Sequence, residues 1–139
     1  MQNKFTDQAR RVLEQAAFAA EVNGHCYIGS EHLLLGLIQV EDCLAGKVLL
    51  NNDVTENKVL NLIYQLIAPD CAVSVKEPAV YTPRVKKILV NAGNEAARFK
   101  ADSIGTEHIL IAMLKETDSV ASRLLNTMGV SVKIGRAHV

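Results

Sequence analysis

Two glutamates, Glu31 and Glu107, each follow an Ile-Gly-Ser or Ile-Gly-Thr segment that precedes an apolar run. The hydroxyl residue of that segment, Ser30 or Thr106, stands where a helix N-cap is expected, so each carboxylate would lie in a first helical turn. There it interacts favourably with the helix dipole, and it can accept charge-assisted hydrogen bonds from a guanidinium. Free backbone N–H groups at helix N-termini can bind an anion. The residues therefore predict helix stabilisation, acceptance of a guanidinium by each carboxylate, or both.

The histidines beside these glutamates raise the alternative of metal binding or catalysis. His32 and His108 directly follow the two glutamates, but the chain has no H-E-x-x-H motif and no third ligand nearby in sequence. We expect both to be structural and to bond the loop backbone near Gly29 and Gly105, glycines that we expect to permit a tight turn. His25 has no such counterpart, so we expect it at the surface.

The cysteines offer no catalytic arrangement. Cys26, Cys43 and Cys71 are odd in number, lack metal-ligand spacing and do not recur in the second half of the chain. We interpret them as free thiols in a reducing cytosol rather than as nucleophiles or metal ligands.

These residues belong to an internal repeat. Residues 5–54 align with 81–130 at a constant offset of 76, and 13 of those 50 positions are identical. Identical pairs include Thr6 with Thr82 and the Gly-Glu-His positions already described. Gene duplication is the simplest explanation, and it predicts two similar halves.

Each half has the apolar period of helices. The first helix of each half should begin after Thr6 or Thr82, with Pro83 at the first helical position of the second copy. The second helices, 31–39 and 107–115, are apolar almost all round and should be central and buried. Third helices should begin at Asp42 and at Asp118 or Ser119, and a fourth should follow Thr55, with a counterpart at Ser131.

We therefore predict an all-α fold of two tandem four-helix repeats, eight helices in total, related by a pseudo-two-fold axis. One domain should span 1–133, with repeat one at 5–67, a linker at 68–80 and repeat two at 81–133. Residues 134–139 lack the apolar period of 59–67 and match a translated sequencing adapter, so we expect a non-native tail.

Composition excludes several classes of protein. Lys plus Arg equals Asp plus Glu at 15 each, which argues against binding of nucleic acid through charge, and no basic recognition helix is evident. The sequence has no apolar run long enough to cross a membrane and no phosphate-binding loop of the G-x-x-x-x-G-K-[ST] type. We expect a cytoplasmic protein without nucleic-acid or membrane partners.

Two motifs carry a family resemblance. The pattern F-T-x-x-A-x-x-V-L is followed by I-G-S-E-H-L-L-L-G-L, and the second half repeats it as Y-T-P-x-x-K-x-I-L and I-G-T-E-H-I-L. Over residues 4–133 the chain resembles the N-terminal double Clp repeat of ClpC-type AAA+ unfoldases. The resemblance implies a module that recruits substrates and MecA-like adaptors for a hexameric ATPase and its partner peptidase.

The resemblance also implies a ligand site. In Gram-positive members of the family this domain reads phosphoarginine on substrates, with one site per repeat. The matching positions here are Thr6, Ser30, Glu31, Thr82, Thr106 and Glu107. No chemistry is expected in this fragment and no cofactor, because ATP would bind only to further domains. An acid at Asp7, where the second repeat has Pro83, should weaken anion binding slightly at one site.

Four further residues could bind partners. Phe5 and Tyr81 are either hydrophobic staples or anchors for a partner, and Arg10 and Lys86 either belong to solvated helix faces or dock acidic adaptors. The alternative functions are a stand-alone Clp-repeat protein and the aggregate-binding domain of a ClpB-type disaggregase.

Overall fold

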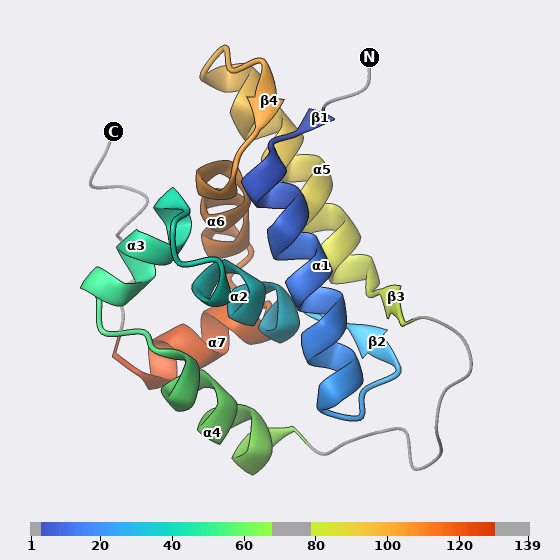
Figure 1. Cartoon of the computed structure of the whole chain (residues 1–139), viewed down its shortest axis with the longest axis vertical. Coiled ribbons are helices and arrows are strands. Elements are labelled where there is room, and N and C mark those ends of the chain that lie inside the picture. Colours follow the sequence, from blue (N-terminus) through green and yellow to red (C-terminus); the bar gives the residue numbers. More distant parts are fainter. Residues whose placement is uncertain (1–3, 68–78, 130–139) are drawn as a thin grey trace.

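The computed structural model describes residues 4–67 and 79–129, and this part of the chain is mostly helical (Figure 1). It contains seven helices and four strands of two residues each. The all-α prediction is therefore confirmed. The expected eighth helix at Ser131, most of the linker at 68–80 and the tail at 134–139 lie outside the described residues, so the eight-helix pseudo-two-fold arrangement stays a prediction.

The elements follow one another in the same order in both repeats. Repeat one contains β1 (Lys4–Phe5), α1 (Asp7–Val22), β2 (Tyr27–Ile28), α2 (Ser30–Gln39), α3 (Leu44–Asn51) and α4 (Glu56–Leu66). Repeat two contains β3 (Val80–Tyr81), α5 (Pro83–Arg98), β4 (Ser103–Ile104), α6 (Thr106–Lys115) and α7 (Val120–Thr127).

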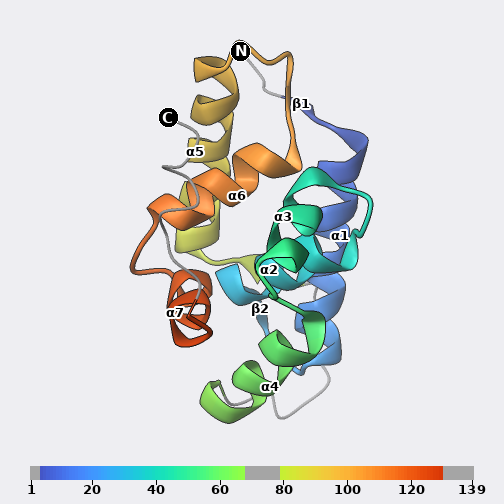
Figure 2. The same cartoon turned by 90° about the vertical axis from the view of Figure 1, so that its left-hand side faces the viewer.

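The second helix of each repeat forms the centre of the molecule, as predicted. In Figure 2, α2 and α6 lie between α1 on one side and α5 on the other. Nine of the ten residues of α2 are buried, and α1 and α5 each turn one apolar face toward this core. α4 packs mainly on α2 and buries only Val59 and Ile63. The core therefore holds the N-termini of α2 and α6 in fixed positions.

The short strands connect one repeat to the other, which the sequence did not indicate. β1 pairs in parallel with β4, so that Phe5 lies opposite Ile104, and β2 pairs in parallel with β3, so that Ile28 lies opposite Tyr81. Each pairing continues by one hydrogen bond: the Thr6 N–H donates to the Ile104 carbonyl at 2.9 Å, and the Thr82 N–H to the Ile28 carbonyl at 3.1 Å. The start of each long helix is thereby tied to the other repeat.

Ser30 and Thr106 also connect the repeats, and the prediction that they cap their own helices is wrong. The N-caps of α2 and α6 are the preceding glycines, and both hydroxyl residues are buried. The Ser30 hydroxyl accepts from the Ala121 N–H of α7 at 2.9 Å, and the Thr106 hydroxyl accepts from the Ala45 N–H of α3 at 3.3 Å. Each therefore satisfies an otherwise unpaired amide in the first turn of a helix in the other repeat.

The third helices begin one or two residues later than every predicted start, at Leu44 and Val120. Ser119 caps α7 and accepts from the Ser122 N–H, and at the equivalent place Cys43 caps α3 through its sulfur, 3.2 Å from the Gly46 nitrogen. Cys43 is a free, buried thiol. Cys26 is disulfide-bonded, so its interpretation as a free thiol is wrong, and Cys71 lies outside the described residues.

Glu116, at the end of α6, joins that helix to α5. Its carboxylate accepts from Arg84 at 2.7 Å and lies 3.3 Å from the Lys87 nitrogen. The hydrogen bond from Arg84, followed by that from Lys87, lowers the pKa of Glu116 below its usual range. A carboxylate whose pKa is lower in the folded state stabilises the fold above its ordinary pKa, and this stability is lost as the pH falls through the lowered value.

We therefore expect Glu116→Gln to reduce the free energy of unfolding at pH 7 by up to about 1 kcal/mol, because both cations remain partly exposed. The difference from wild type should shrink as the pH falls below 4.5, the ordinary pKa of a glutamate, and through the lowered pKa of Glu116. Urea unfolding at a series of pH values measures it. A difference that stays constant with pH would show that the ion pairs contribute nothing.

Candidate functional site

The N-termini of α1 and α5 are built in the same way, and the predicted N-caps are confirmed. The Thr6 hydroxyl accepts from the Ala9 N–H and the Thr82 hydroxyl accepts from the Val85 N–H, both at 3.1 Å. The remaining amides of a first helical turn have no acceptor within the helix. For α1 these belong to Asp7 and Gln8. For α5, Pro83 has no N–H, so this terminus offers one donor fewer than α1 does.

The two glutamates lie directly against the glycines that precede their helices. A Cβ placed on Gly29 would be 2.3 Å from Glu31 Oε1, and one placed on Gly105 would be 2.3 Å from Glu107 Oε1. Both glycines have φ of −95°, which any residue can adopt, so the expected tight turn is not what requires glycine. A side chain on either glycine would instead displace the carboxylate from this position, because the carboxylate occupies the space of a Cβ.

Strand pairing combines these parts across the two repeats. The Thr6 N–H bonds to Ile104, which immediately precedes Gly105, so the N-terminus of α1 lies beside the turn that carries Glu107. By the equivalent bond from Thr82 to Ile28, the N-terminus of α5 lies beside the turn that carries Glu31. The sequence suggested that each repeat supplies its own threonine and glutamate. The structure instead joins each threonine to the turn that carries the glutamate of the other repeat.

The two carboxylates differ in exposure. Glu31 is 1% exposed and its Oε2 accepts from the Tyr27 hydroxyl at 3.1 Å, whereas Glu107 is only half-buried. Thr6 and Thr82 are also half-buried, which leaves them accessible from solvent. The two other predicted site residues, Ser30 and Thr106, are buried with their hydroxyls bonded inside the fold, so they position helices of the neighbouring repeat.

The histidines support the backbone of these turns, as predicted. His32 Nδ1 accepts from the Gly29 N–H at 2.8 Å, and His108 Nδ1 accepts from the Gly105 N–H at 2.9 Å. His25 is buried rather than at the surface, so that prediction is wrong. Its Nδ1 lies 2.7 Å from His32 Nε2, and because His32 Nδ1 is an acceptor, the proton between the two rings belongs to His32.

The four residues predicted as weaker partner contacts lie around these helix starts. Phe5 and Tyr81 are half-buried against the core, and burial raises the pKa of the Tyr81 hydroxyl. Arg10 pairs with Asp7 on the surface of α1. Lys86 is exposed and has no ion pair with any residue in the described ranges. The partner-binding role of these four residues therefore stays a prediction.

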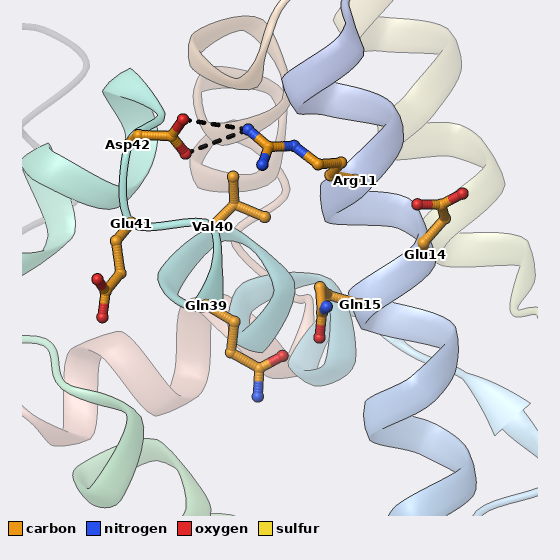
Figure 3. A pocket seen from close by; sticks show the side chains of 7 residues that line it. All are labelled: Arg11, Glu14, Gln15, Gln39, Val40, Glu41 and Asp42. Carbon is orange, nitrogen blue, oxygen red and sulfur yellow. Dashed lines mark hydrogen bonds and ion pairs between the residues drawn. The ribbon is translucent and has the colours of Figure 1, made fainter.

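A second feature, which the sequence analysis missed, is a surface pocket of about 390 Å³ between α1 and the end of α2 (Figure 3). Arg11 spans it and donates to both oxygens of Asp42, at 3.2 and 3.1 Å. The hydrogen bond from Arg11 lowers the pKa of Asp42 below its usual range. The pocket contains none of the predicted site residues; it is lined by Arg11, Glu14, Gln15, Gln39, Val40, Glu41 and Asp42.

Other kinds of site were also sought in residues 4–67 and 79–129. No group of three or more His, Cys, Asp or Glu side chains in these residues could hold a metal ion. Within the same ranges, no helix has the length and apolar character needed to cross a bilayer.

Comparison with known proteins gives a family match over most of the chain. The model of the Clp repeat (R) N-terminal domain matches residues 4–128. The chain is 35% identical over 136 residues to the ATP-dependent Clp protease ATP-binding subunit ClpC of Staphylococcus epidermidis, covering 98% of this chain and 16% of that protein. It is also 35% identical over 142 residues to the chaperone protein ClpB of Oceanobacillus iheyensis, covering 100% of this chain and 17% of that protein.

A solved structure confirms the likeness of the fold. The N-terminal domain of the Clp-associated chaperone ClpD from Arabidopsis thaliana superposes with a TM-score of 0.79 at 23% identity, covering 96% of this chain and 90% of that one. The chain thus spans about one sixth of the length of the curated relatives but nearly all of a solved N-terminal domain.

Proposed function

The chain belongs to the Clp repeat (R) N-terminal domain family, and from this premise we propose that it is a binding module that recruits protein clients and adaptors to a Clp-type ATPase. The ATPase would be cytoplasmic, and the ClpC-like role with MecA-like adaptors and a partner peptidase is the form we favour. The module itself binds and positions; unfolding and ATP hydrolysis belong to other domains of such an assembly.

One observation supports a specific ligand. At two places in the domain, a turn that carries a glutamate lies beside a helix N-terminus whose first amides have no acceptor within the helix. Phosphoarginine carries a guanidinium at one end of its head group and a phosphoryl group at the other. Glu107 would accept the guanidinium, while the Asp7 and Gln8 amides of α1 would donate to the phosphoryl oxygens. Glu31 and the start of α5 would form the second site. Two sites on one rigid body can hold a doubly modified client more tightly than one.

The two sites are not equal in donors or charge. The α1 terminus offers two amides but carries Asp7, whose negative charge is offset by its ion pair with Arg10. The α5 terminus offers one amide fewer because Pro83 has no N–H, but its first turn has no acidic residue to repel an anion. Measured affinities at the two sites should therefore differ.

We expect phosphoarginine to bind wild type at both sites, and Glu31→Ala and Glu107→Ala each to remove one of them. Loss of a charge-assisted hydrogen bond of about 1.5–3 kcal/mol should weaken the affected site roughly tenfold or more. Isothermal titration of the three proteins measures this. Equal binding by all three, or no binding by any, would contradict the proposal and leave adaptor docking as the function.

Thr55 and Glu56 provide a matched control within the chain. Thr55 caps α4 and Glu56 lies in the first turn of that helix, so Glu56 is a first-turn glutamate outside the proposed sites. Glu56→Ala should therefore leave phosphoarginine binding unchanged. Free arginine and inorganic phosphate each present only one of the two groups, and both should bind more weakly than phosphoarginine.

The disaggregase alternative remains a second candidate because a ClpB chaperone matches the chain as well as a ClpC subunit does. An aggregate-binding domain would hold unfolded polypeptide without any need for phosphorylation. Binding of an unmodified, reduced model substrate with an affinity unaffected by Glu31→Ala and Glu107→Ala would favour this alternative.

A further inference from the structure

The carboxylates of Glu31 and Glu107 have nearly the same position relative to their own turns. A Cβ on the preceding glycine would lie 2.3 Å from Oε1 and 2.9 Å from Cδ in both repeats. The supporting histidine bonds to the turn at 2.8 Å in one repeat and 2.9 Å in the other. The duplicated domain therefore provides an internal comparison, in which one carboxylate serves as the reference for the other.

The covering of the two carboxylates is different. In repeat one the Tyr27 hydroxyl donates to Glu31 Oε2, and the Tyr27 ring reaches within 3.0 Å of the Cβ position of Gly29. In repeat two the aligned residue is Ser103, and the three atoms nearest to the corresponding position of Gly105 all belong to Glu107. Glu31 is 1% exposed, whereas Glu107 is half-buried.

We propose that Tyr27 is a gate over Glu31 that makes the two guanidinium acceptors unequal, so that a ligand occupies the Glu107 site first. For ligand binding this inference rests on the proposed function. A guanidinium that approaches Glu31 has to compete with the Tyr27 hydroxyl for Oε2 and to move the Tyr27 ring aside. Neither step is needed at Glu107. Tyr27 therefore determines the order of occupation without contributing a new acceptor.

The gate can be tested without any ligand by carboxyl labelling of the full chain with a carbodiimide and glycine ethyl ester, read by mass spectrometry. In wild type, Glu107 should react faster than Glu31. Tyr27→Ser should raise the rate at Glu31 roughly tenfold, the factor expected for loss of one such hydrogen bond, and leave Glu107 unchanged. Tyr27→Phe, which keeps the ring, should give a smaller increase.

The reciprocal variant protects the test from an unfolded protein. Ser103→Tyr should slow the labelling of Glu107, and circular dichroism identifies any variant that does not fold. If Tyr27→Ser does not fold, the Phe and Ser103→Tyr variants decide the outcome. An unchanged rate at Glu31 in the folded Tyr27 variants would overturn the gate.

Phosphoarginine titration followed by site-resolved NMR then separates the gate from the proposed function. In wild type the signals around Glu107 should saturate at lower ligand concentration than those around Glu31, and Tyr27→Ser should bring the two closer together. If the carboxyl-labelling rates change as expected but phosphoarginine does not bind, the gate is supported and the proposed ligand is contradicted. If phosphoarginine binds and its affinity for each site is the same in wild type and in both Tyr27 variants, the result would support the ligand and overturn the gate.

Discussion

Gly36→Ala is expected to destabilise the domain by about 1–3 kcal/mol, although it places the best helix former in the middle of a helix. Gly36 lies where α2 crosses α1, and a Cβ there would be 2.4 Å from the Val12 carbonyl oxygen and 3.2 Å from the Ala16 nitrogen. Both are backbone atoms, which cannot rotate away as the end of a side chain can. The two helices must therefore separate to admit the methyl group.

Whether Gly36→Ala raises or lowers the free energy of unfolding decides between two effects. Helix propensity alone predicts that replacing this glycine by alanine stabilises the helix by about 1 kcal/mol. The close approach predicts the opposite, with a fall in Tm of roughly 5–10 °C for a domain of this size. The aligned residue of repeat two is Ala112, which is fully buried, so α5 and α6 accommodate a methyl group at the equivalent crossing. Thermal unfolding measures the difference, and a stabilised Gly36→Ala variant would show that α1 and α2 do not approach this closely.

Gly105→Ala is expected to reduce phosphoarginine affinity at the Glu107 site roughly tenfold or more while changing stability little. The φ of −95° suits alanine, but the new methyl group would occupy the position of Glu107 Oε1. A glutamate side chain can move aside at small cost, so the fold remains while the acceptor leaves its place.

Gly29→Ala is the matched variant for the other site, because its Cβ would meet Glu31 Oε1 at the same 2.3 Å. Calorimetric titration together with thermal unfolding separates binding from stability in both variants. Unchanged affinity in folded Gly105→Ala would mean that the observed position of the Glu107 carboxylate is not the one that the ligand uses.

Local signals in the sequence predicted much of this fold. Thr6 and Thr82 cap the long helices because capping involves only residues three apart, and the apolar periods of 9–20 and 85–96 are properties of single helices. The structural role of the histidines was also predictable, because His32 bonds to Gly29, three residues away. Such interactions need no knowledge of the second repeat.

What the sequence could not reveal depends on contacts between the repeats. The strands have two residues each, which is too short for an alternating pattern, and their partners are distant in the chain. The Ser30 hydroxyl bonds to an amide 91 residues away, so its role resembled that of a local cap. Cys43 was not recognised as a cap because a thiol is an unusual acceptor, although its aligned residue Ser119 was an available signal. The pairing of Thr6 with the turn of Glu107 was missed because it joins two residues that are distant in the chain.

The central claim is that each ligand site combines a helix start from one repeat with a glutamate from the other. Thr6→Ala should be measured for phosphoarginine binding in two backgrounds, Glu31→Ala and Glu107→Ala, each of which leaves one site. We predict that it weakens binding in the Glu31→Ala background, where the Glu107 site remains, and has no effect in the Glu107→Ala background. Thr6→Ala weakening binding only in the Glu107→Ala background would show that each site lies within one repeat and would contradict the account.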